Sequence, residues 1–216
     1  MPRPKVYPDD LRDRLVDTAA VRLASQGPQE LSLRELAASQ GTSTNAIYSI
    51  FGGKPQLIAA VIESAYASFE AAQHAVVTDH PTMETLFVLG EAHRDWALAH
   101  PALYQVMFGA AMTGRQSEVL PEGGSPEAGD DEGGADAAAT RRPRSLAAVA
   151  EALQRDGLLR SDIDLDDLCL ALWSSVHGFV TLEISGTPLL TDAGEQFRRI
   201  QEMFLRGLAG ARALAA

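Results

Sequence analysis

The 216-residue sequence lacks several features on which whole classes of protein depend. Its one cysteine, Cys169, lies in an apolar helical stretch, which leaves no disulfide framework and no cysteine-based metal site. No apolar run approaches the roughly eighteen residues that a membrane span requires. The N-terminus MPRPKVYPDD also lacks the apolar core of a signal peptide. These absences predict a soluble protein in the reducing cytoplasm, with no membrane partner.

Recognisable catalytic patterns are missing as well. We find no nucleophile paired with a base and no glycine-rich phosphate loop. The histidines His74, His80, His93 and His100 have no metal-site spacing with any cysteine. We therefore expect no enzyme activity, no metal and no other cofactor. The rival interpretation is an enzyme or ligand carrier built around an aromatic-rich cavity.

Basic residues are fewer than acidic ones, 18 Lys or Arg against 29 Asp or Glu, which gives the chain a formal net charge of −11. This value argues against a generic nucleic-acid binder. The distribution is uneven: residues 1–58 hold seven Lys or Arg against six Asp or Glu, so the excess negative charge lies beyond them. The N-terminal segment can therefore approach phosphates, but we expect only modest non-specific affinity for DNA.

The segment Thr44 to Phe51 has one polar and one apolar face. At 100° per residue, the polar face holds Thr44, Asn45, Tyr48 and Ser49, and the apolar residues occupy the other half. A helix of two turns is not stable alone, so its apolar half must pack against neighbouring helices. The exposed hydroxyls, amide and phenol suit a nucleic-acid groove.

The residues before this segment complete a helix-turn-helix pattern. Ser32 and Glu35 form a capping box that starts a helix near residue 33, and Gly41 ends that helix. Ser43 then caps the next helix. A helix, a turn of about three residues and a second helix form the helix-turn-helix geometry.

A short basic arm precedes the first helix. Arg3 and Lys5 are separated by prolines, which favour an extended backbone. Such an arm can follow a phosphate backbone or enter a minor groove. A disordered terminus explains the same residues equally well.

Helical periodicity continues through most of the chain, which predicts an all-α fold. The first helix opens at Pro8-Asp9-Asp10 and ends at Gly27-Pro28. Beyond the segment Thr44 to Phe51, the recognition helix of the predicted helix-turn-helix, helices are expected at about residues 54–77, 82–99, 101–112, 141–156, 164–183 and 193–208. Residues 118–136 hold seven acids and no base, and predict a flexible acidic loop at about 114–139, with a domain linker as the alternative.

Large side chains concentrate in the middle of the chain, and the last two helices are unusually apolar. One group of side chains either forms core or lines a pocket for an apolar or aromatic molecule: Phe87, His93, Trp96, Tyr104, Met107 and Phe108. In the last helix, Phe197, Ile200, Phe204 and Leu208 form a predicted apolar stripe. The last two helices present more apolar surface than one small domain can cover, which predicts a homodimer closed as a four-helix bundle.

The chain resembles the TetR family of bacterial transcription regulators over nearly its whole length. The resemblance is strongest from Leu31 to Leu57, where Gly41, Ser43, Tyr48, Phe51 and Lys54 match the family pattern. The C-terminal half, with Tyr104-x-x-Met107-Phe108-Gly109 and Trp173 before His177-Gly178, is similar to a subgroup whose ligand domain carries a Trp and a His-Gly pair.

The resemblance implies roles for individual residues. Tyr48 and Lys54 are expected to hold phosphates, Ser32 and Arg34 to approach the backbone or a base, and Thr44 and Asn45 to face the major groove. The family often has Gly at the position of Asn45, so Asn45 either reads adenine or contacts a phosphate. The full set of candidate DNA contacts is Arg3, Lys5, Ser32, Arg34, Ser43, Thr44, Asn45, Tyr48, Ser49 and Lys54.

The candidate ligand contacts add Trp173 and His177 to the aromatic group. His177 is either a hydrogen-bonded packing residue or a ligand donor or pH sensor. The expected architecture is an N-terminal three-helix DNA-binding domain at 1–54 and a ligand-sensing, dimerising domain at 55–216. Its partners would be double-stranded operator DNA, a second copy of the chain and a small effector, with repression favoured by the resemblance alone. A further alternative is that the helix-turn-helix binds a protein.

Overall fold

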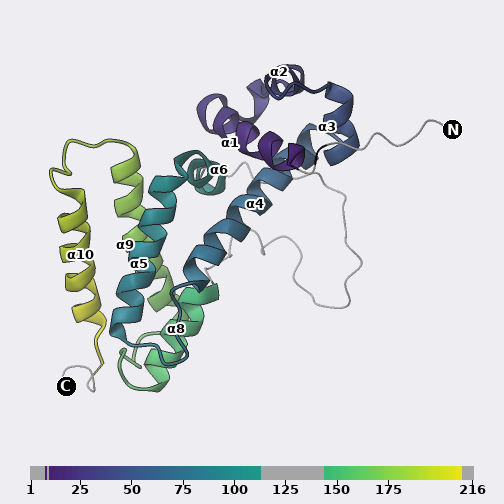
Figure 1. The fold of residues 1–216 in the computed structure, drawn as a ribbon. Coiled ribbons are helices and arrows are strands. Elements are labelled where there is room, and N and C mark those ends of the chain that lie inside the picture. The colour runs from purple at the N-terminus through teal and green to yellow at the C-terminus, as the bar shows by residue number, and fades with distance from the viewer. Residues whose placement is uncertain (1–7, 9, 113–143, 211–216) are drawn as a thin grey trace. The chain divides into compact units, whose positions relative to one another are not determined.

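The computed structural model describes residues 8, 10–112 and 144–210, and this part of the chain is helical apart from turns and one isolated bridge between Leu159 and Ala209. The predicted all-α fold is confirmed (Figure 1). The helices are α1 (Leu11–Glu30), α2 (Leu33–Ser39), α3 (Thr44–Phe51), α4 (Lys54–His74), α5 (Met83–Ala99), α6 (Pro101–Met112), α8 (Arg144–Arg155), α9 (Leu165–Ile184) and α10 (Ala193–Leu208). The basic arm with Arg3 and Lys5 and the acidic loop at 114–139 lie outside the described residues.

Membrane-spanning helices are not found in the described part of the chain, where each helix is too short or too polar to cross a bilayer. The described residues form two compact units. The first contains residues 10–67 and 100–112, and the second contains residues 68–99 and 144–210. The division falls inside α4, and α6 groups with the N-terminal helices. The functional boundary expected at residue 54 stays a prediction.

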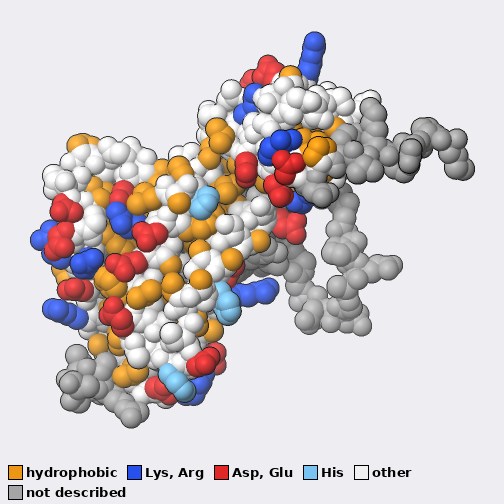
Figure 2. All heavy atoms as spheres, viewed as in Figure 1, with side chains coloured by type: hydrophobic (Ala, Val, Ile, Leu, Met, Phe, Trp, Pro, Cys, Tyr) orange, Lys and Arg blue, Asp and Glu red, His pale blue; other side chains and the backbone are white. Residues whose placement is uncertain are grey.

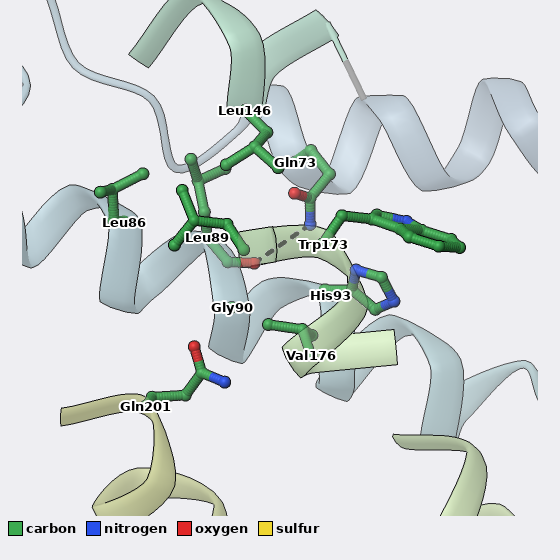
Figure 3. Close-up of a pocket in the computed structure, with 10 residues that line it drawn as sticks. Gln73, Leu86, Leu89, Gly90, His93, Leu146, Trp173, Val176 and Gln201 are labelled. Atoms are coloured by element: carbon green, nitrogen blue, oxygen red, sulfur yellow. Dashed lines mark hydrogen bonds between the residues drawn. The ribbon is translucent and has the colours of Figure 1, made fainter. Parts of the chain in front are cut away.

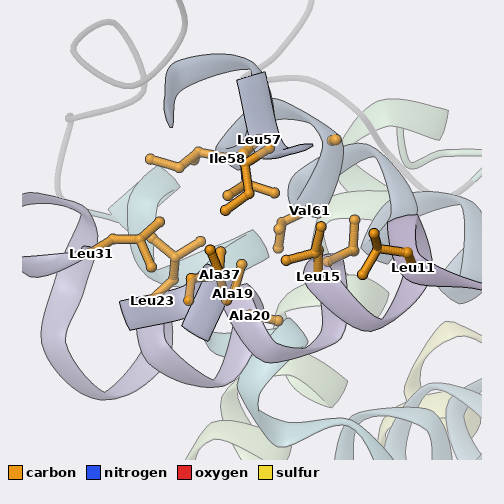
Figure 4. Close-up of a cluster of buried hydrophobic side chains, with 14 residues drawn as sticks. Leu11, Leu15, Ala19, Ala20, Leu23, Leu31, Ala37, Leu57, Ile58 and Val61 are labelled. Carbon is orange, nitrogen blue, oxygen red and sulfur yellow. The ribbon is translucent and has the colours of Figure 1, made fainter. Parts of the chain in front are cut away.

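The core of the first unit is built on one face of α1. Leu11, Leu15, Val16, Ala19 and Leu23 are buried, as their spacing predicts. Figure 4 shows Leu15 and Val61 side by side within this cluster, to which α2 and α4 also contribute. The α1 helix kinks at Gly27, where φ is 78°, and one further turn begins at Pro28. The predicted end at Gly27-Pro28 therefore corresponds to this kink.

Local caps fix the turn between α2 and α3. The backbone N–H of Glu35 donates to Ser32 Oγ at 3.4 Å, and the N–H of Ala46 donates to Ser43 Oγ at 3.3 Å. Gly41 follows α2 with φ 63°, a left-handed conformation that costs a residue with a Cβ about 1–2 kcal/mol. The Glu35 carboxylate pairs with Arg22 at 3.1 Å, so one half of the predicted capping box is present. The helix-turn-helix is confirmed.

The second unit packs α5, α8, α9 and α10 around a separate core that includes Leu89, Leu153 and Leu168. One polar link joins three of these helices. Arg94 on α5 donates to both carboxylate oxygens of Glu183 on α9, at 2.7 and 2.5 Å. Its guanidinium also lies 5.6 Å from the centroid of the Phe197 ring on α10. The bidentate pair raises the pKa of Arg94 and fixes the lateral position of α9 against α5.

The stripe predicted for the last helix is partly wrong. Phe197 is buried, but Ile200 is exposed, and the buried line of α10 continues through Gln201 and Leu205. Hydrophobic patterning misplaced the stripe because it does not assign a glutamine to a core. Gln201 is accommodated there because its amide donates to Ser175 Oγ on α9 at 3.4 Å.

Gly41 provides a test of the turn that positions α3. Gly41→Ala introduces a Cβ at positive φ, so we expect it to lower the free energy of unfolding by about 1–2 kcal/mol. The matched control is Gly194→Ala, in the first turn of α10, where the new Cβ meets only Asp192 Oδ1 at 3.9 Å. The control should be neutral or slightly stabilising in urea unfolding. Equal effects of the two changes would contradict the assignment of strain to Gly41.

Candidate DNA-binding surface and ligand cavity

The polar face predicted for α3 is presented to solvent. Asn45, Tyr48 and Ser49 are exposed, with 54% of the Tyr48 surface accessible, and Thr44 is half-buried. On the opposite side, Ala46 and Ile47 are fully buried. The buried side holds the helix in place, so the exposed amide, phenol and hydroxyls have a defined orientation. An exposed tyrosine is suited to a phosphate contact, because its hydroxyl can donate a hydrogen bond to a phosphate oxygen.

Lys54 lies at the first position of α4, and its ammonium is engaged within the protein. Nζ donates to the backbone carbonyl of Gln29 at 3.0 Å, at the C-terminal end of α1. A cation is favourable at that position because helix carbonyls there carry partial negative charge. Lys54 therefore links α1 to α4, and a phosphate contact by Lys54 has to share or replace this bond.

The remaining candidate contacts surround α3. Arg34 is exposed at the second position of α2, while Ser32 is half-buried and Ser43 exposed. Both serine hydroxyls already accept a cap hydrogen bond but remain able to donate. Sequence reasoning missed Arg12, an exposed residue whose guanidinium lies 5.7 Å from the centroid of Phe51. Periodicity placed Arg12 on the first helix but gave no sign that it neighbours the end of α3.

Acidic neighbours reduce the positive field of this unit. Arg14 pairs with Asp10 at 3.3 Å, and Arg22 pairs with Glu35 at 3.1 Å. Figure 2 shows basic and acidic side chains intermixed over the visible face of α1 to α3. This arrangement agrees with the small positive balance of the N-terminal residues. Attraction of DNA from a distance is therefore weak, and close contacts have to supply the affinity.

A small cavity lies in the second unit, with a volume of about 20 Å³. Its wall is mostly aliphatic, from Leu86 and Leu89 on α5, Leu146 on α8, and Leu172 and Val176 on α9. Figure 3 shows these side chains together with Gln73, His93, Trp173 and Gln201. This volume holds one or two water molecules, whereas sites for drug-sized ligands measure about 300–1,000 Å³.

Three polar side chains line this cavity, and each is almost fully buried. Gln73 donates to the carbonyl of Leu89 at 3.3 Å, and Gln201 donates to Ser175 Oγ at 3.4 Å. His93 lies edge-to-face with Phe69, with ring centroids 4.9 Å apart. A carboxamide has two donors and an acceptor, so Gln73 and Gln201 keep capacity for a further partner.

The structure brings only some of the predicted ligand contacts together. His93 and Trp173 line the cavity, and His177 stacks on Trp173 with centroids 4.5 Å apart. Trp96 is buried nearby and donates from its indole to Ser68 Oγ at 3.0 Å, and Phe87 packs against the surrounding core. The other three predicted ligand contacts, Tyr104, Met107 and Phe108, belong to the first unit. There Phe108 contacts both Tyr66 and Tyr104, and Met107 is buried.

Gln73 and Gln201 were missed by sequence reasoning, although a signal existed. Gln73 lies four residues after the buried Phe69, and Gln201 lies midway between the buried Phe197 and Leu205. Each glutamine is therefore in register with an apolar stripe, where a polar side chain is costly unless it has a partner. A glutamine at such a position indicates a buried polar site.

Burial determines the protonation state of the histidine that lines the cavity, His93. The pKa of His93 is lowered to about 3. The larger cause is the hydration that a charged imidazole would lose on burial, and the smaller is repulsion from His177. Burial also lowers the pKa of His177. His93 is therefore neutral at physiological pH and offers one donor and one acceptor nitrogen.

The buried histidine predicts a specific dependence of stability on pH. Unfolding restores His93 to an ordinary pKa near 6.5, so the unfolded state takes up a proton that the folded state excludes. The contribution of neutral, buried His93 to the free energy of unfolding is fully present above pH 6.5 and is lost as the pH falls from 6.5 toward 3. Between pH 7.5 and 5.0, wild type should lose about 2 kcal/mol more than His93→Phe in urea unfolding. The exposed His80→Phe is the control and should follow wild type; identical pH profiles for all three would contradict the burial effect.

Comparisons with known proteins agree with these features. Residues 15–61 match the model for bacterial regulatory proteins of the tetR family. Residues 86–204, more than half of the chain, match the model for the tetracyclin repressor-like C-terminal domain. The HTH-type transcriptional regulator Rv1816 of Mycobacterium tuberculosis is 22% identical over 207 residues, covering 88% of each protein.

Solved structures show the same fold. A bacterial regulatory protein of the tetR family from Rhodococcus RHA1 superposes with a TM-score of 0.70 at 19% identity, covering 94% of this chain and all of that one. A protein of unknown function from Rhodococcus sp. RHA1 gives a TM-score of 0.69 at 24% identity, covering 96% of this chain and all of that one. With the N-terminal family model matched over residues 15–61 and the C-terminal one over residues 86–204, this chain belongs to the TetR family of bacterial transcriptional regulators.

Proposed function

We propose that the chain is a repressor that binds a palindromic operator as a homodimer and is released by a small, mainly apolar or aromatic effector. The observation that carries this proposal is the course of α4. It starts at Lys54, with only Gly52 and Gly53 between it and α3, and runs without interruption to His74, so that Gln73 in its last turn lines the cavity. One helix thus has one end beside the DNA-reading helix and the other in the wall of a ligand site.

The exposed face of α3 supplies the DNA contacts in this proposal. Asn45 faces the major groove, where an asparagine amide can pair with both N6 and N7 of adenine, worth about 1–3 kcal/mol of discrimination. Tyr48 and Lys54 hold phosphates in this proposal. These contacts position the helix, while Asn45 reads sequence. A single weakly charged unit would bind poorly, so the operator has to engage two copies.

Apolar side chains exposed on α9 and α10 support dimerisation. Leu170 and Leu182 are exposed on α9, and Ile200 and Met203 are exposed on α10, with 71% of the Met203 surface accessible. Leu170 and Leu182 are separated by twelve residues, which places them about 120° apart around α9. An isologous contact through both helices would bury these side chains and bring two recognition helices to successive major grooves, about 34–36 Å apart.

Release by the effector follows from the same helix. The cavity is too small for an effector in its present form, so binding has to move the side chains that line it, Gln73 among them. A shift of Gln73 biases the orientation of α4, and through α4 that of α3. DNA and effector then favour different states, so each weakens binding of the other by the same factor.

Substitutions on α3 and at the start of α4 test the DNA contacts. Using fragments that wild type selects from a random DNA pool, Lys54→Met should weaken binding to all sequences about equally and lower the slope of log affinity against log salt by about one per subunit. Tyr48→Phe should also weaken binding uniformly, by a factor of about three to ten. Asn45→Ala should instead relax preference at one base pair in each half-site.

The control for these measurements is Arg155→Ala, which removes an exposed positive charge at the end of α8. It should leave affinity, sequence preference and salt slope unchanged. Unaltered DNA binding in all three α3 and α4 variants would show that this surface does not read DNA. Binding of a protein through the same face would then be the remaining interpretation.

A charge placed in the exposed apolar surface tests dimerisation. Met203→Glu and Leu182→Glu should each shift the protein from dimer to monomer in sedimentation velocity, because a carboxylate cannot be buried without a partner. Val21→Glu is the control, since Val21 is also an exposed apolar side chain, 61% accessible, but lies on α1. A monomeric wild type would contradict the proposed homodimer, and dissociation by Val21→Glu alone would place the interface elsewhere.

A further inference from the structure

The chemistry of the cavity narrows the class of effector. No charged side chain is among the residues that line it, and its three polar members are two carboxamides and an imidazole. Burial keeps the imidazole of His93 neutral. An ionised ligand group placed here would lose its hydration without gaining a counter-ion, which costs several kcal/mol. Neutral donors and acceptors, in contrast, find complementary partners.

The volume of the cavity sets a second limit on the effector, its size. A cavity of about 20 Å³ accommodates one polar group of the size of a hydroxyl or carbonyl, or the water that would occupy its place. The remainder of a ligand has to displace the aliphatic wall formed by residues such as Leu89, Leu172 and Val176. Only apolar ligand atoms suit that environment, because the wall offers them no hydrogen bonds.

We propose that this cavity receives the uncharged polar end of a small, largely apolar molecule, bound by Gln73, His93 and Gln201, and that it excludes carboxylates and ammonium groups. The inference rests on the proposed role as a ligand-responsive regulator and defines the chemical class of the effector. A hydroxyl, a ketone, an ester or an amide meets the requirement. The three polar side chains come from α4, α5 and α10.

Gly90 provides a way to reduce the cavity without removing any of its polar groups. A Cβ built on Gly90 would lie 3.4 Å from Gln201 Oε1, 3.5 Å from Val176 Cγ2 and 3.6 Å from Phe197 Cζ. These are ordinary or slightly tight contacts, so the alanine fits, but its methyl occupies space beside the cavity. Alanine also favours the helix over glycine, so Gly90→Ala should remain folded.

The experiment compares three ligands of equal chain length: 1-hexanol, hexanoate and hexylamine at pH 7.5. Trp173 lines the cavity, and the chain has two tryptophans, so its indole N–H signal in the nitrogen-15 NMR spectrum reports occupancy once Trp96→Phe has identified the other. Hexanol should shift the Trp173 signal in a saturable manner. Hexanoate and hexylamine should bind at least about tenfold more weakly.

Variants of the intact chain test the site itself. Gly90→Ala should weaken hexanol binding at least about tenfold, whereas Gly178→Ala, a helical glycine on α9 with open space around it, should bind like wild type. Gln201→Leu should weaken hexanol binding by a factor of about three to ten, the value of one hydrogen bond. Circular dichroism establishes that each variant is folded.

Several outcomes would overturn the inference. These are equal or tighter binding of either charged ligand, unchanged hexanol binding by Gly90→Ala, and absence of a Trp173 shift with all three ligands. The measurement contains no DNA, so its failure leaves the tests of Asn45, Tyr48 and Lys54 standing. Conversely, loss of the DNA-binding role would leave the ligand preference of the cavity intact.

Discussion

The recognition helix α3 has only eight residues, and a helix of that length is not stable in isolation. Its position is therefore determined by its surroundings: the burial of Ala46 and Ile47, the cap from Ser43, and the left-handed Gly52 that ends it. The same packing that stabilises α3 leaves its polar side exposed. Because α4 begins immediately after Gly52-Gly53, the helix that reads DNA cannot be reoriented independently of α4. Lys54, bonded to the carbonyl of Gln29, adds a direct link from α4 to α1. The DNA-reading geometry of this unit is thus a consequence of packing rather than of the local sequence of α3 alone.

The nearly balanced charge of residues 1–58 makes the geometry of α3 important for DNA binding. Arg14 and Arg22 are paired with acidic neighbours, so the described part of the first unit carries little unbalanced positive charge near α3. Long-range attraction contributes little for such a surface, and each contact has to be made at close range. Two linked copies raise the effective concentration of the second recognition helix once the first has bound. A regulator of this kind gains specificity from the low background of non-specific binding, at the expense of affinity for any single half-site.

Local features were predictable from the sequence, and contacts between distant helices were not. Ser32, Gly41 and Ser43 act within a few residues of their own position, so their capping roles follow from spacing and match the structure. Asn45, Tyr48 and Ser49 were placed on the exposed face by periodicity alone. The cavity depends instead on which helices meet. Tyr104 and Phe108 are as aromatic as Trp173, yet they lie in the first unit, where Phe108 packs against both Tyr66 and Tyr104, and nothing in composition separates the two groups. Gln73 and Gln201 were overlooked because a search for large apolar side chains passes over glutamine.

The cavity is an unfavourable feature for a protein that needs only stability. Filling the space with aliphatic side chains would remove three buried polar groups and would add contacts between atoms. Gly90 adds a further cost, since glycine inside a helix is about 0.5–1 kcal/mol less favourable than alanine. The Arg94–Glu183 pair and the edge-to-face ring contacts around Phe69 hold α5, α9 and the end of α4 around this cavity. A packed interior responds to an inserted group by moving between discrete arrangements, because it cannot deform continuously. In the proposed mechanism, one molecule bound in this small polar cavity selects between two arrangements of α4.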